Sequence, residues 1–207
     1  MSTWKAPSVP SEAVPRPALF LDRDGVVIDD ENYLADPEKV RLLPGVTGAM
    51  AAARDAGFLL IGVSNQSGIG RGYFSLREFN QVMQRLEYLL AEESVGFDSF
   101  FFCPHAPGAA CNCRKPQPGL LEEAQKFHSL DLKESWIVGD KSSDVTFGRA
   151  AGLGSVLVRT GYGRSEELLV REKWVGDPRV LVADDLPAAV RAILDLTRDG
   201  GGRDLDA

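Results

Sequence analysis

The chain has 207 residues, of which 44% are hydrophobic and 26% are charged, and its net charge at pH 7 is −7. These values are typical of one globular domain with its own core, and the acidic balance argues against a nucleic-acid partner bound through its phosphates. No apolar run approaches the ~20 residues of a membrane span, and the N-terminus lacks a signal-peptide layout, so we expect a cytoplasmic protein that binds neither nucleic acid nor membranes. We also expect it to be a monomer.

The predicted elements alternate between short apolar strands and helices. Residues 1–17 contain four prolines, so we expect a flexible leader, then one domain over 18–197 and a flexible tail over 198–207. Apolar runs predict strands at 18–21, 58–63, 97–102, 135–138, 155–158 and, at an edge, 180–182. Helical spacing and capping residues predict helices at 43–56, 75–93, 120–128, 144–151 and 186–196, with a polar connection at 161–178. This alternation predicts a single Rossmann-like α/β domain, with a mainly parallel sheet flanked by helices and no large cap.

Carboxylates directly follow two of the predicted strands. Asp22 and Asp24 come after the strand at 18–21, and Asp140 comes after the strand at 135–138. Because the carboxyl ends of parallel strands meet at one edge of a sheet, we expect these three side chains to converge. Converging carboxylates repel one another unless a cation neutralises them, and Mg²⁺ prefers such oxygen ligands. An acidic surface turn is the alternative for Asp22 and Asp24 taken alone.

A polar, glycine-rich loop follows the strand at 58–63. It runs from Ser64 to Gly72, and its hydroxyl groups and three glycines suit a close approach of backbone N–H groups to an anion. A plain connector is the alternative if the loop is taken alone. Arg114, Lys115 and Lys141 supply the positive charge that a phosphate requires. The three converging carboxylates, the anion-binding loop and these cations together predict a phosphoryl-transfer site.

The three cysteines of the chain lie close to a histidine, as Cys103, His105, Cys111 and Cys113. Three thiolates and one imidazole make a complete tetrahedral set for a structural Zn²⁺, with no position open for catalysis. The segment between them offers few apolar residues for packing, so a metal would stabilise it. The alternative is three buried or unused cysteines beside a surface histidine. The other histidine, His128, has no such neighbours and is expected to be a surface or packing residue without partners.

Four motifs occur in an order that resembles the haloacid dehalogenase (HAD) superfamily of phosphatases. They are Asp22-Arg23-Asp24-Gly25, Ser64-Asn65, Lys115 and Gly139-Asp140-Lys141-Ser142-Ser143-Asp144. Longer segments, over 64–72, 103–119 and 138–144, are similar to the D,D-heptose 1,7-bisphosphate phosphatases and to their relatives, the histidinol-phosphate phosphatases. Residues 158–163 also resemble the heptose enzymes, and the similarity extends over about residues 18–196.

The resemblance implies a HAD domain and assigns roles to the catalytic residues. Asp22 would attack phosphorus and form an aspartyl-phosphate. Asp24 would protonate the leaving sugar oxygen and then activate the hydrolytic water. Ser64 and Lys115 would hold the transferred phosphoryl group and stabilise its charge.

The resemblance also implies the metal and substrate ligands. Mg²⁺ would be held by the Asp22 carboxylate, the Asp24 backbone carbonyl and Asp140, with Asp144 behind its water shell. Zn²⁺ bound by the three cysteines and His105 would rigidify the loop that presents Arg114 and Lys115. The residues that would contact a small phosphorylated sugar are Asp30, Glu31, Asn32, Tyr33, Asn65, Gln66, Ser67, Arg114 and Lys141.

Three departures from the family pattern bear on the substrate. Ile28 stands where Asn is frequent, Ser64 replaces a frequent Thr, and the short spacer between His105 and Cys111 is nearer to the histidinol-phosphate type. The leading hypothesis is a Mg²⁺-dependent hydrolase that removes the 7-phosphate of D-glycero-D-manno-heptose 1,7-bisphosphate, in nucleotide-activated heptose biosynthesis for surface polysaccharide such as lipopolysaccharide. Histidinol-phosphate phosphatase is the enzyme alternative. A receiver-like module or a zinc-stapled scaffold is the non-enzyme alternative.

Overall fold

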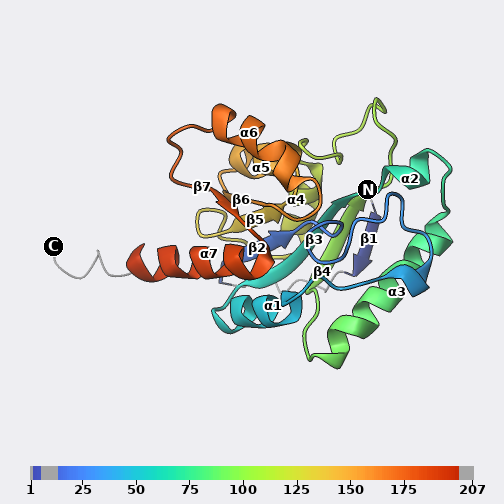
Figure 1. Ribbon diagram of the computed structural model, residues 1–207, viewed down its shortest axis with the longest axis horizontal. Helices are drawn as coiled ribbons and strands as arrows, with labels where there is room; N and C mark the ends of the chain where they lie inside the picture. Colours follow the sequence, from blue (N-terminus) through green and yellow to red (C-terminus); the bar gives the residue numbers. More distant parts are fainter. Residues whose placement is uncertain (1, 6–13, 201–207) are drawn as a thin grey trace.

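A seven-stranded β-sheet runs through the centre of the protein, with helices on both of its faces (Figure 1). This computed structural model describes residues 2–5 and 14–200. The strands are β1 (Ser2–Lys5), β2 (Ala18–Leu21), β3 (Leu59–Asn65), β4 (Ser99–Cys103), β5 (Trp136–Gly139), β6 (Gly154–Val158) and β7 (Val180–Ala183). Their order in the sheet is β1-β4-β3-β2-β5-β6-β7, and all pairs are parallel except β1 with β4. The predicted mainly parallel sheet is confirmed.

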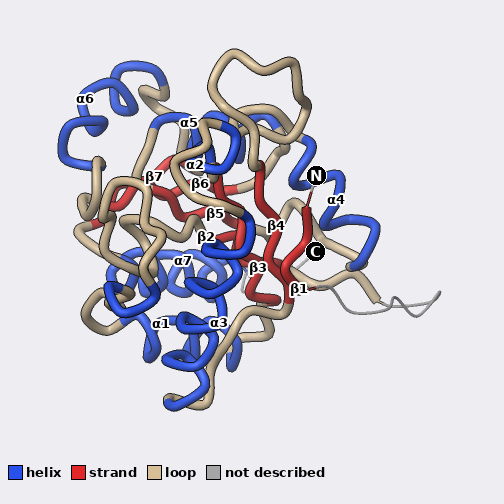
Figure 2. The backbone as a smooth tube through the Cα atoms, turned by 90° about the vertical axis from the view of Figure 1, so that its right-hand side faces the viewer, coloured by secondary structure: helices blue, strands red, loops and turns tan. Residues whose placement is uncertain are grey.

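The helices form two layers. They are η1 (Pro37–Lys39, a 3-10 turn), α1 (Val46–Asp55), α2 (Ser67–Gly70), α3 (Leu76–Glu92), α4 (Gly119–Phe127), α5 (Ser142–Ala150), α6 (Gly163–Lys173) and α7 (Leu186–Gly200). Helices α1, α3 and α7 cover one face of the sheet, and α4, α5 and α6 cover the other (Figure 2). Within the described part of the chain, no helix combines the length and the apolar character that a membrane crossing requires.

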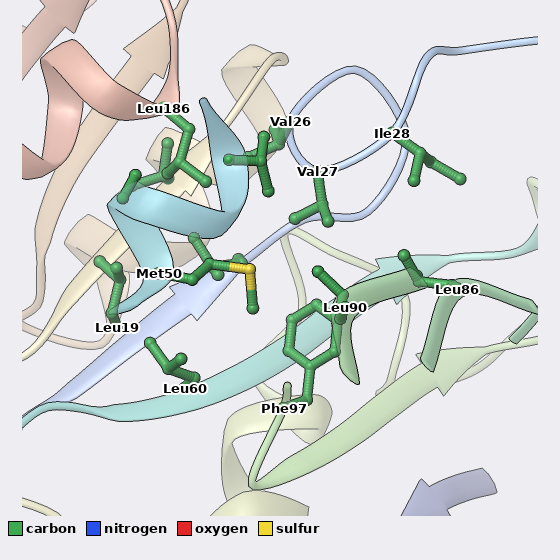
Figure 3. Close-up of a cluster of buried hydrophobic side chains, with 14 of the residues drawn as sticks. Leu19, Val26, Val27, Ile28, Met50, Leu60, Leu86, Leu90, Phe97 and Leu186 are labelled. Carbon is green, nitrogen blue, oxygen red and sulfur yellow. The ribbon is translucent and has the colours of Figure 1, made fainter. Parts of the chain in front are cut away.

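The apolar strands form because the sheet is covered on both faces. Every residue of β2 and β4 is buried, as expected for strands in a three-layer α/β domain. In the larger core cluster, Leu19 and Leu60 of the sheet pack with Met50 of α1 (Figure 3). This rigid sheet fixes the positions of the loops that leave its carboxyl edge.

The segments predicted to be irregular contain more structure than expected. Residues 2–5 form β1, and Arg16 forms a β-bridge with Leu130, so a flexible leader over 1–17 is wrong for these positions; residues 1 and 6–13 lie outside the described residues. The predicted connection at 161–178 contains the helix α6, which buries only Gly163 and Val170 and so has no apolar periodicity to reveal it. Helix α7 continues to residue 200, into the predicted tail, and residues 201–207 are not described.

Candidate active site

A cleft of about 280 Å³ opens at the carboxyl ends of β2, β3 and β5. Because β2 lies between β3 and β5, the loops that follow these strands are neighbours, and their predicted site residues meet. The predicted residues that line the cleft are Asp22, Asp24, Asp30, Asn32, Tyr33, Ser64, Asn65, Gln66, Ser67, Arg114, Lys115 and Lys141.

Glu31 is the predicted sugar-contacting residue that the cleft leaves out. The Asn32 N–H donates to the Asp30 carboxylate at 3.0 Å, which closes a turn with Glu31 near its tip. The side chain of Glu31 is exposed and does not line the cleft. Asp30 and Asn32 line the cleft as expected, whereas a contact of Glu31 with substrate stays a prediction that this conformation does not support.

Three buried carboxylates lie together at the base of the site, and we call Asp22, Asp140 and Asp144 the carboxylate cluster; Asp22 and Asp144 line the cleft, whereas Asp140 is fully buried and does not. Oxygen atoms of the three lie within 4.8 Å of one another. The Lys115 ammonium is inserted among them, 3.1 Å from Asp22 Oδ1 and 2.7 Å from Asp144 Oδ1. It also donates to the Val63 carbonyl at 2.6 Å. Lys115 is thus held as a fixed, buried positive charge beside Asp22.

The charges of these groups set their protonation. Burial by itself would raise the pKa of Asp22, but Lys115 and Lys141 hold it below its ordinary value. Burial, together with the charges of Asp22 and Asp144, raises the pKa of Asp140 to about 7. Asp22 is therefore an anion suited to nucleophilic attack, and Asp140 is a buried carboxyl group that lacks a full counter-charge.

The carboxylate cluster fits a divalent cation. Asp140 Oδ1 is buried and accepts no hydrogen bond, with the Lys141 ammonium 3.4 Å away. An unsatisfied buried carboxylate oxygen is costly in an apolar interior, and a hard cation such as Mg²⁺ would satisfy it. Asp144 differs, because its Oδ1 pairs with Lys115 and its Oδ2 accepts the Lys141 N–H at 3.1 Å. We therefore assign Asp144 to the positioning of the two lysines.

Two glycines and a tyrosine enclose Asp140 from the other side. Gly25 and Gly161 have φ values of +76° and +54°, and a Cβ at Gly25 would lie 2.5 Å from Asp140 Oδ2 and 2.9 Å from the Cα of Gly161. The Tyr162 N–H donates to Asp140 Oδ2 at 2.9 Å. The Tyr162 hydroxyl donates to Asn32 Oδ1 at 3.1 Å, and its ring centre lies 4.3 Å from the Lys141 ammonium. Sequence reasoning missed Tyr162 as a site residue, although the resemblance over 158–163 was the available signal.

Asn65 supports the site through the backbone. Its Nδ2 donates to the Lys115 carbonyl at 3.1 Å, and its Oδ1 accepts the Lys115 N–H at 2.9 Å. The amide therefore fixes the position of Lys115 across a separation of 50 residues. Asn65 lines the cleft as predicted, but both ends of its amide are used within the protein.

The outer rim of the cleft is aromatic and partly strained. Asn32 and Tyr33 both adopt positive φ values, +45° and +66°, which non-glycine residues rarely do. The Tyr33 ring makes an edge-to-face contact with Tyr73, with 4.7 Å between ring centres. Arg114 also lines the cleft, and its Nη1 is buried without a hydrogen-bond partner among the described residues. The site therefore contains one guanidinium nitrogen whose hydrogen-bonding capacity the protein does not use.

The predicted zinc ligands also converge, and we call Cys103, His105, Cys111 and Cys113 the thiolate cluster. Their ligand atoms lie within 4.8 Å of one another, with His105 Nδ1 3.5 Å from Cys103 Sγ and 3.2 Å from Cys113 Sγ. Burial and the neighbouring Cys113 thiol raise the pKa of Cys103 to about 12. A bound cation would reverse that shift, because zinc ligands are thiolates. This sulfur and nitrogen set fits Zn²⁺.

His128 has a partner, contrary to expectation. It is buried at the end of α4, and its Nε2 shares a hydrogen bond with Ser99 Oγ on β4. Burial lowers its pKa. The contact spans 29 residues, so no local pattern could have indicated it.

Comparison with known proteins relates this geometry to an enzyme class. Residues 112–189 match the family described as HAD-hydrolase-like. The chain is 38% identical to the D-glycero-beta-D-manno-heptose-1,7-bisphosphate 7-phosphatase of Yersinia pestis over 184 residues, which cover 85% of this chain and 96% of that protein. It is 41% identical to the Vibrio cholerae protein of the same name over 160 residues, 73% of this chain and 86% of that protein.

A solved structure is similar over nearly the same length. The D,D-heptose 1,7-bisphosphate phosphatase of B. bronchiseptica, complexed with magnesium and phosphate, superposes with a TM-score of 0.78 at 32% identity. The match covers 87% of this chain and 99% of that one. A putative HAD-like phosphatase from Mesorhizobium loti superposes with a TM-score of 0.73 at 35% identity, covering 92% of this chain and 94% of that one.

Proposed function

Because this chain belongs to the HAD-like hydrolases, in the family of the D-glycero-beta-D-manno-heptose-1,7-bisphosphate 7-phosphatases, we propose that it removes the 7-phosphate from this sugar bisphosphate. The observation that carries the proposal is the meeting of Asp22, Asp24, Ser64 and Lys115 in one cleft, above Asp140. The family confirms the predicted phosphatase activity, and the names of the relatives favour the β anomer.

We propose that Asp22 is the nucleophile. Its anionic carboxylate attacks phosphorus and forms an aspartyl-phosphate, while the bond to the sugar oxygen breaks. Asp24 gives a proton to that oxygen and later takes one from the water that hydrolyses the aspartyl-phosphate. Lys115 neutralises part of the charge on the transferred phosphoryl oxygens, and the Ser64 hydroxyl donates a hydrogen bond to them.

The proposed Mg²⁺ ligands are Asp22, Asp140 and the backbone carbonyl of Asp24. Bound there, Mg²⁺ would neutralise the carboxylates and polarise the phosphoryl group. The unsatisfied Oδ1 of Asp140 supports this assignment, and so does the magnesium and phosphate complex of the B. bronchiseptica relative. For Zn²⁺, we propose the thiolate cluster as the complete ligand set, with a structural role.

A second phosphate on the substrate would use the cationic groups that line the cleft. The buried Nη1 of Arg114 lacks a hydrogen-bond partner among the described residues, and the partly exposed Lys141 ammonium is only loosely paired, 3.8 Å from Asp30 and 3.4 Å from Asp140. Fixed guanidinium groups suit phosphate oxygens. We propose that the sugar lies between the two phosphates, against Asp30, Asn32 and Tyr33.

The experiment that tests this function is phosphate release with Mg²⁺, from both anomers of heptose 1,7-bisphosphate and from histidinol phosphate at matched concentrations. We expect a strong preference for the β-bisphosphate. A preference for histidinol phosphate would refute the substrate while leaving the catalytic roles in place. A stable phosphorylated protein with no turnover would support the receiver-like alternative. The monomeric state and the cytoplasmic location stay predictions.

A further inference from the structure

Arg23, which lies between Asp22 and Asp24 in the sequence, has its side chain inside the protein and only 1% exposed. The guanidinium carbon lies 5.5 Å from the centre of the Phe79 ring, and Nη1 lies 3.8 Å from the Met83 sulfur. Burying a guanidinium among such side chains is costly unless an anion pairs with it. Because α3 offers no anion here, the positive charge of Arg23 must be neutralised by Asp24, on the other side of the guanidinium.

Arg23 binds the Asp24 carboxylate with two of its nitrogens. Nη2 donates to Asp24 Oδ1 at 2.8 Å and to Oδ2 at 2.9 Å, and Nε donates to Oδ1 at 3.1 Å. A planar guanidinium held in this way fixes the plane of the carboxylate as well as its position. The Asp24 side chain keeps 19% of its surface exposed and lines the cleft, so it remains accessible to a substrate.

Gln66 links this ion pair to the phosphate-binding hydroxyl. Its Oε1 accepts from Arg23 Nη2 at 3.1 Å, while its Nε2 donates to Asp24 Oδ2 at 2.8 Å and to Ser64 Oγ at 2.9 Å. The reversed amide would set Nε2 against the Arg23 donor and Oε1 against the Asp24 carboxylate. Arg23 therefore determines which way the amide points. Because Ser64 Oγ accepts from Gln66, its own hydrogen can be donated into the cleft.

We propose that Arg23 and Gln66 are positioning residues, which together hold the Asp24 carboxylate and the Ser64 hydroxyl in their working orientations. The inference rests on the proposed function, because it requires Asp24 to protonate the leaving oxygen. It also replaces the predicted role of Gln66 as a substrate ligand, since both hydrogens of its amide are donated within the protein.

The test compares two leaving groups in the variant Arg23→Met, which suits the apolar wall of Phe79 and Met83. A sugar alkoxide needs a proton as it leaves, whereas p-nitrophenolate does not. We expect kcat/KM to fall about 100-fold for a sugar phosphate and less than about threefold for p-nitrophenyl phosphate. Slower hydrolysis of the aspartyl-phosphate should also produce a burst of p-nitrophenolate, and Arg23→Lys should recover part of the sugar phosphate rate.

The matched control is Arg85→Met. Arg85 lies on α3 itself and, like Arg23, has its guanidinium over an aromatic ring, 5.3 Å from the centre of Tyr88, but it does not line the cleft. We expect this variant to hydrolyse both phosphates at the wild-type rate. A second variant, Gln66→Met, leaves the pair of Arg23 and Asp24 intact and releases Ser64, so we expect losses on both substrates, with the larger loss on the sugar phosphate.

Equal losses on the two phosphates in folded Arg23→Met protein, or no loss on either, would overturn the inference. If Arg23→Met fails to fold, Gln66→Met carries the same comparison, and wild-type rates there would overturn it. The proposed function fails separately: a wild-type protein that hydrolyses other sugar phosphates but not heptose bisphosphate refutes the substrate, and the comparison of leaving groups can still be read.

Discussion

The carboxylate cluster and the thiolate cluster could each hold a metal ion, but they are built on different kinds of structure. The carboxylates follow β2 and β5, deep in the domain, and the ammonium of Lys115 already lies among them. The thiolates lie at the end of β4 and on a loop whose residues 107–110 are all exposed. The core and a lysine stabilise the first set, whereas the loop of the second has little else to order it. We therefore expect a metal to serve catalysis in the carboxylate cluster and folding in the thiolate cluster.

We expect the thiolate cluster to influence the carboxylate cluster, but not the reverse. Cys113 belongs to the thiolate cluster, and Lys115, two residues later, ends among the carboxylates. Loss of the zinc should therefore displace Lys115 and lower the rate of catalysis. Loss of magnesium should leave the thiolate cluster unchanged, because the sheet and the lysines hold the carboxylates without it. The following predictions test this asymmetry.

The largest expected effect is that of Asp22→Asn on turnover. Removing the nucleophile should lower kcat by about 10⁴-fold or more, as it does in other hydrolases with covalent intermediates. The fold should persist, since the change removes no packing, and zinc content should stay at the wild-type level. Phosphate release, thermal unfolding and elemental analysis measure these three properties. The control is Asp184→Asn, at an exposed position outside the cleft. Normal turnover in folded Asp22→Asn protein would refute the mechanism.

Cys111→Ser should remove the zinc and lower Tm by roughly 10 °C, because the metal's binding free energy contributes to folding. Turnover should fall as well, through the displacement of Lys115. Elemental analysis and thermal unfolding give the two primary measurements. Ala109→Ser changes an exposed residue of the same loop that is not a ligand, and it should change neither. Full zinc occupancy in Cys111→Ser would show that the ligand assignment is wrong.

Gly161→Ala tests the enclosure of Asp140. The new Cβ would contact the Asp140 carboxylate, so we expect the Mg²⁺ concentration for half-maximal activity to rise about 10-fold to 100-fold. Gly176→Ala is the matched control, because Gly176 also has a positive φ, +76°, but its Cβ would meet no atom within 4 Å. It introduces similar backbone strain away from the site. Equal Mg²⁺ dependence in the two variants would contradict the assignment of Asp140.

The smallest expected effect is a pH dependence of magnesium binding. Burial and the neighbouring carboxylates raise the pKa of Asp140 from 3.8 to about 7 in the folded protein, so the metal-free fold takes up a proton that the unfolded chain lacks. The free energy of unfolding of the metal-free protein should therefore fall as the pH rises from the unfolded pKa of 3.8 to the folded pKa of about 7.

Magnesium needs the ionised form of Asp140, so the stabilisation that Mg²⁺ provides should increase as the pH rises. One pH unit below this pKa costs about 1.4 kcal/mol of binding, or about 3 °C in the Mg²⁺-induced rise of Tm. Thermal unfolding at pH 6 and pH 8, with and without Mg²⁺, measures this difference. Asp140→Asn should abolish it. An identical Mg²⁺ effect at both pH values in the wild type would exclude proton competition at Asp140.

Much of the fold could be predicted because apolar strands covered on both faces leave a strong local pattern. All six parallel strands were found at their positions within a few residues. Helix α6 was missed because it is mostly charged and buries few residues. Strand β1 was missed because a proline-rich context hides it, and its structure depends on pairing with β4. Edge elements of this kind are decided by the neighbouring strand and not by their own sequence.

The sequence by itself determined which reactive groups the site contains, since Asp22, Asp24, Ser64 and Asp140 each occupy a motif position at or near a strand end, and Lys115 occupies one in the loop before α4. Only the tertiary structure decided how these groups are held. Lys115 meets Asn65 across 50 residues, Gln66 meets Arg23 across 43, and Tyr162 meets Asp140 across 22. Such contacts join separate loops through the sheet, and a hydrogen bond between distant residues leaves no periodicity in the chain. The reactive groups could therefore be predicted, whereas their supports depended on folding.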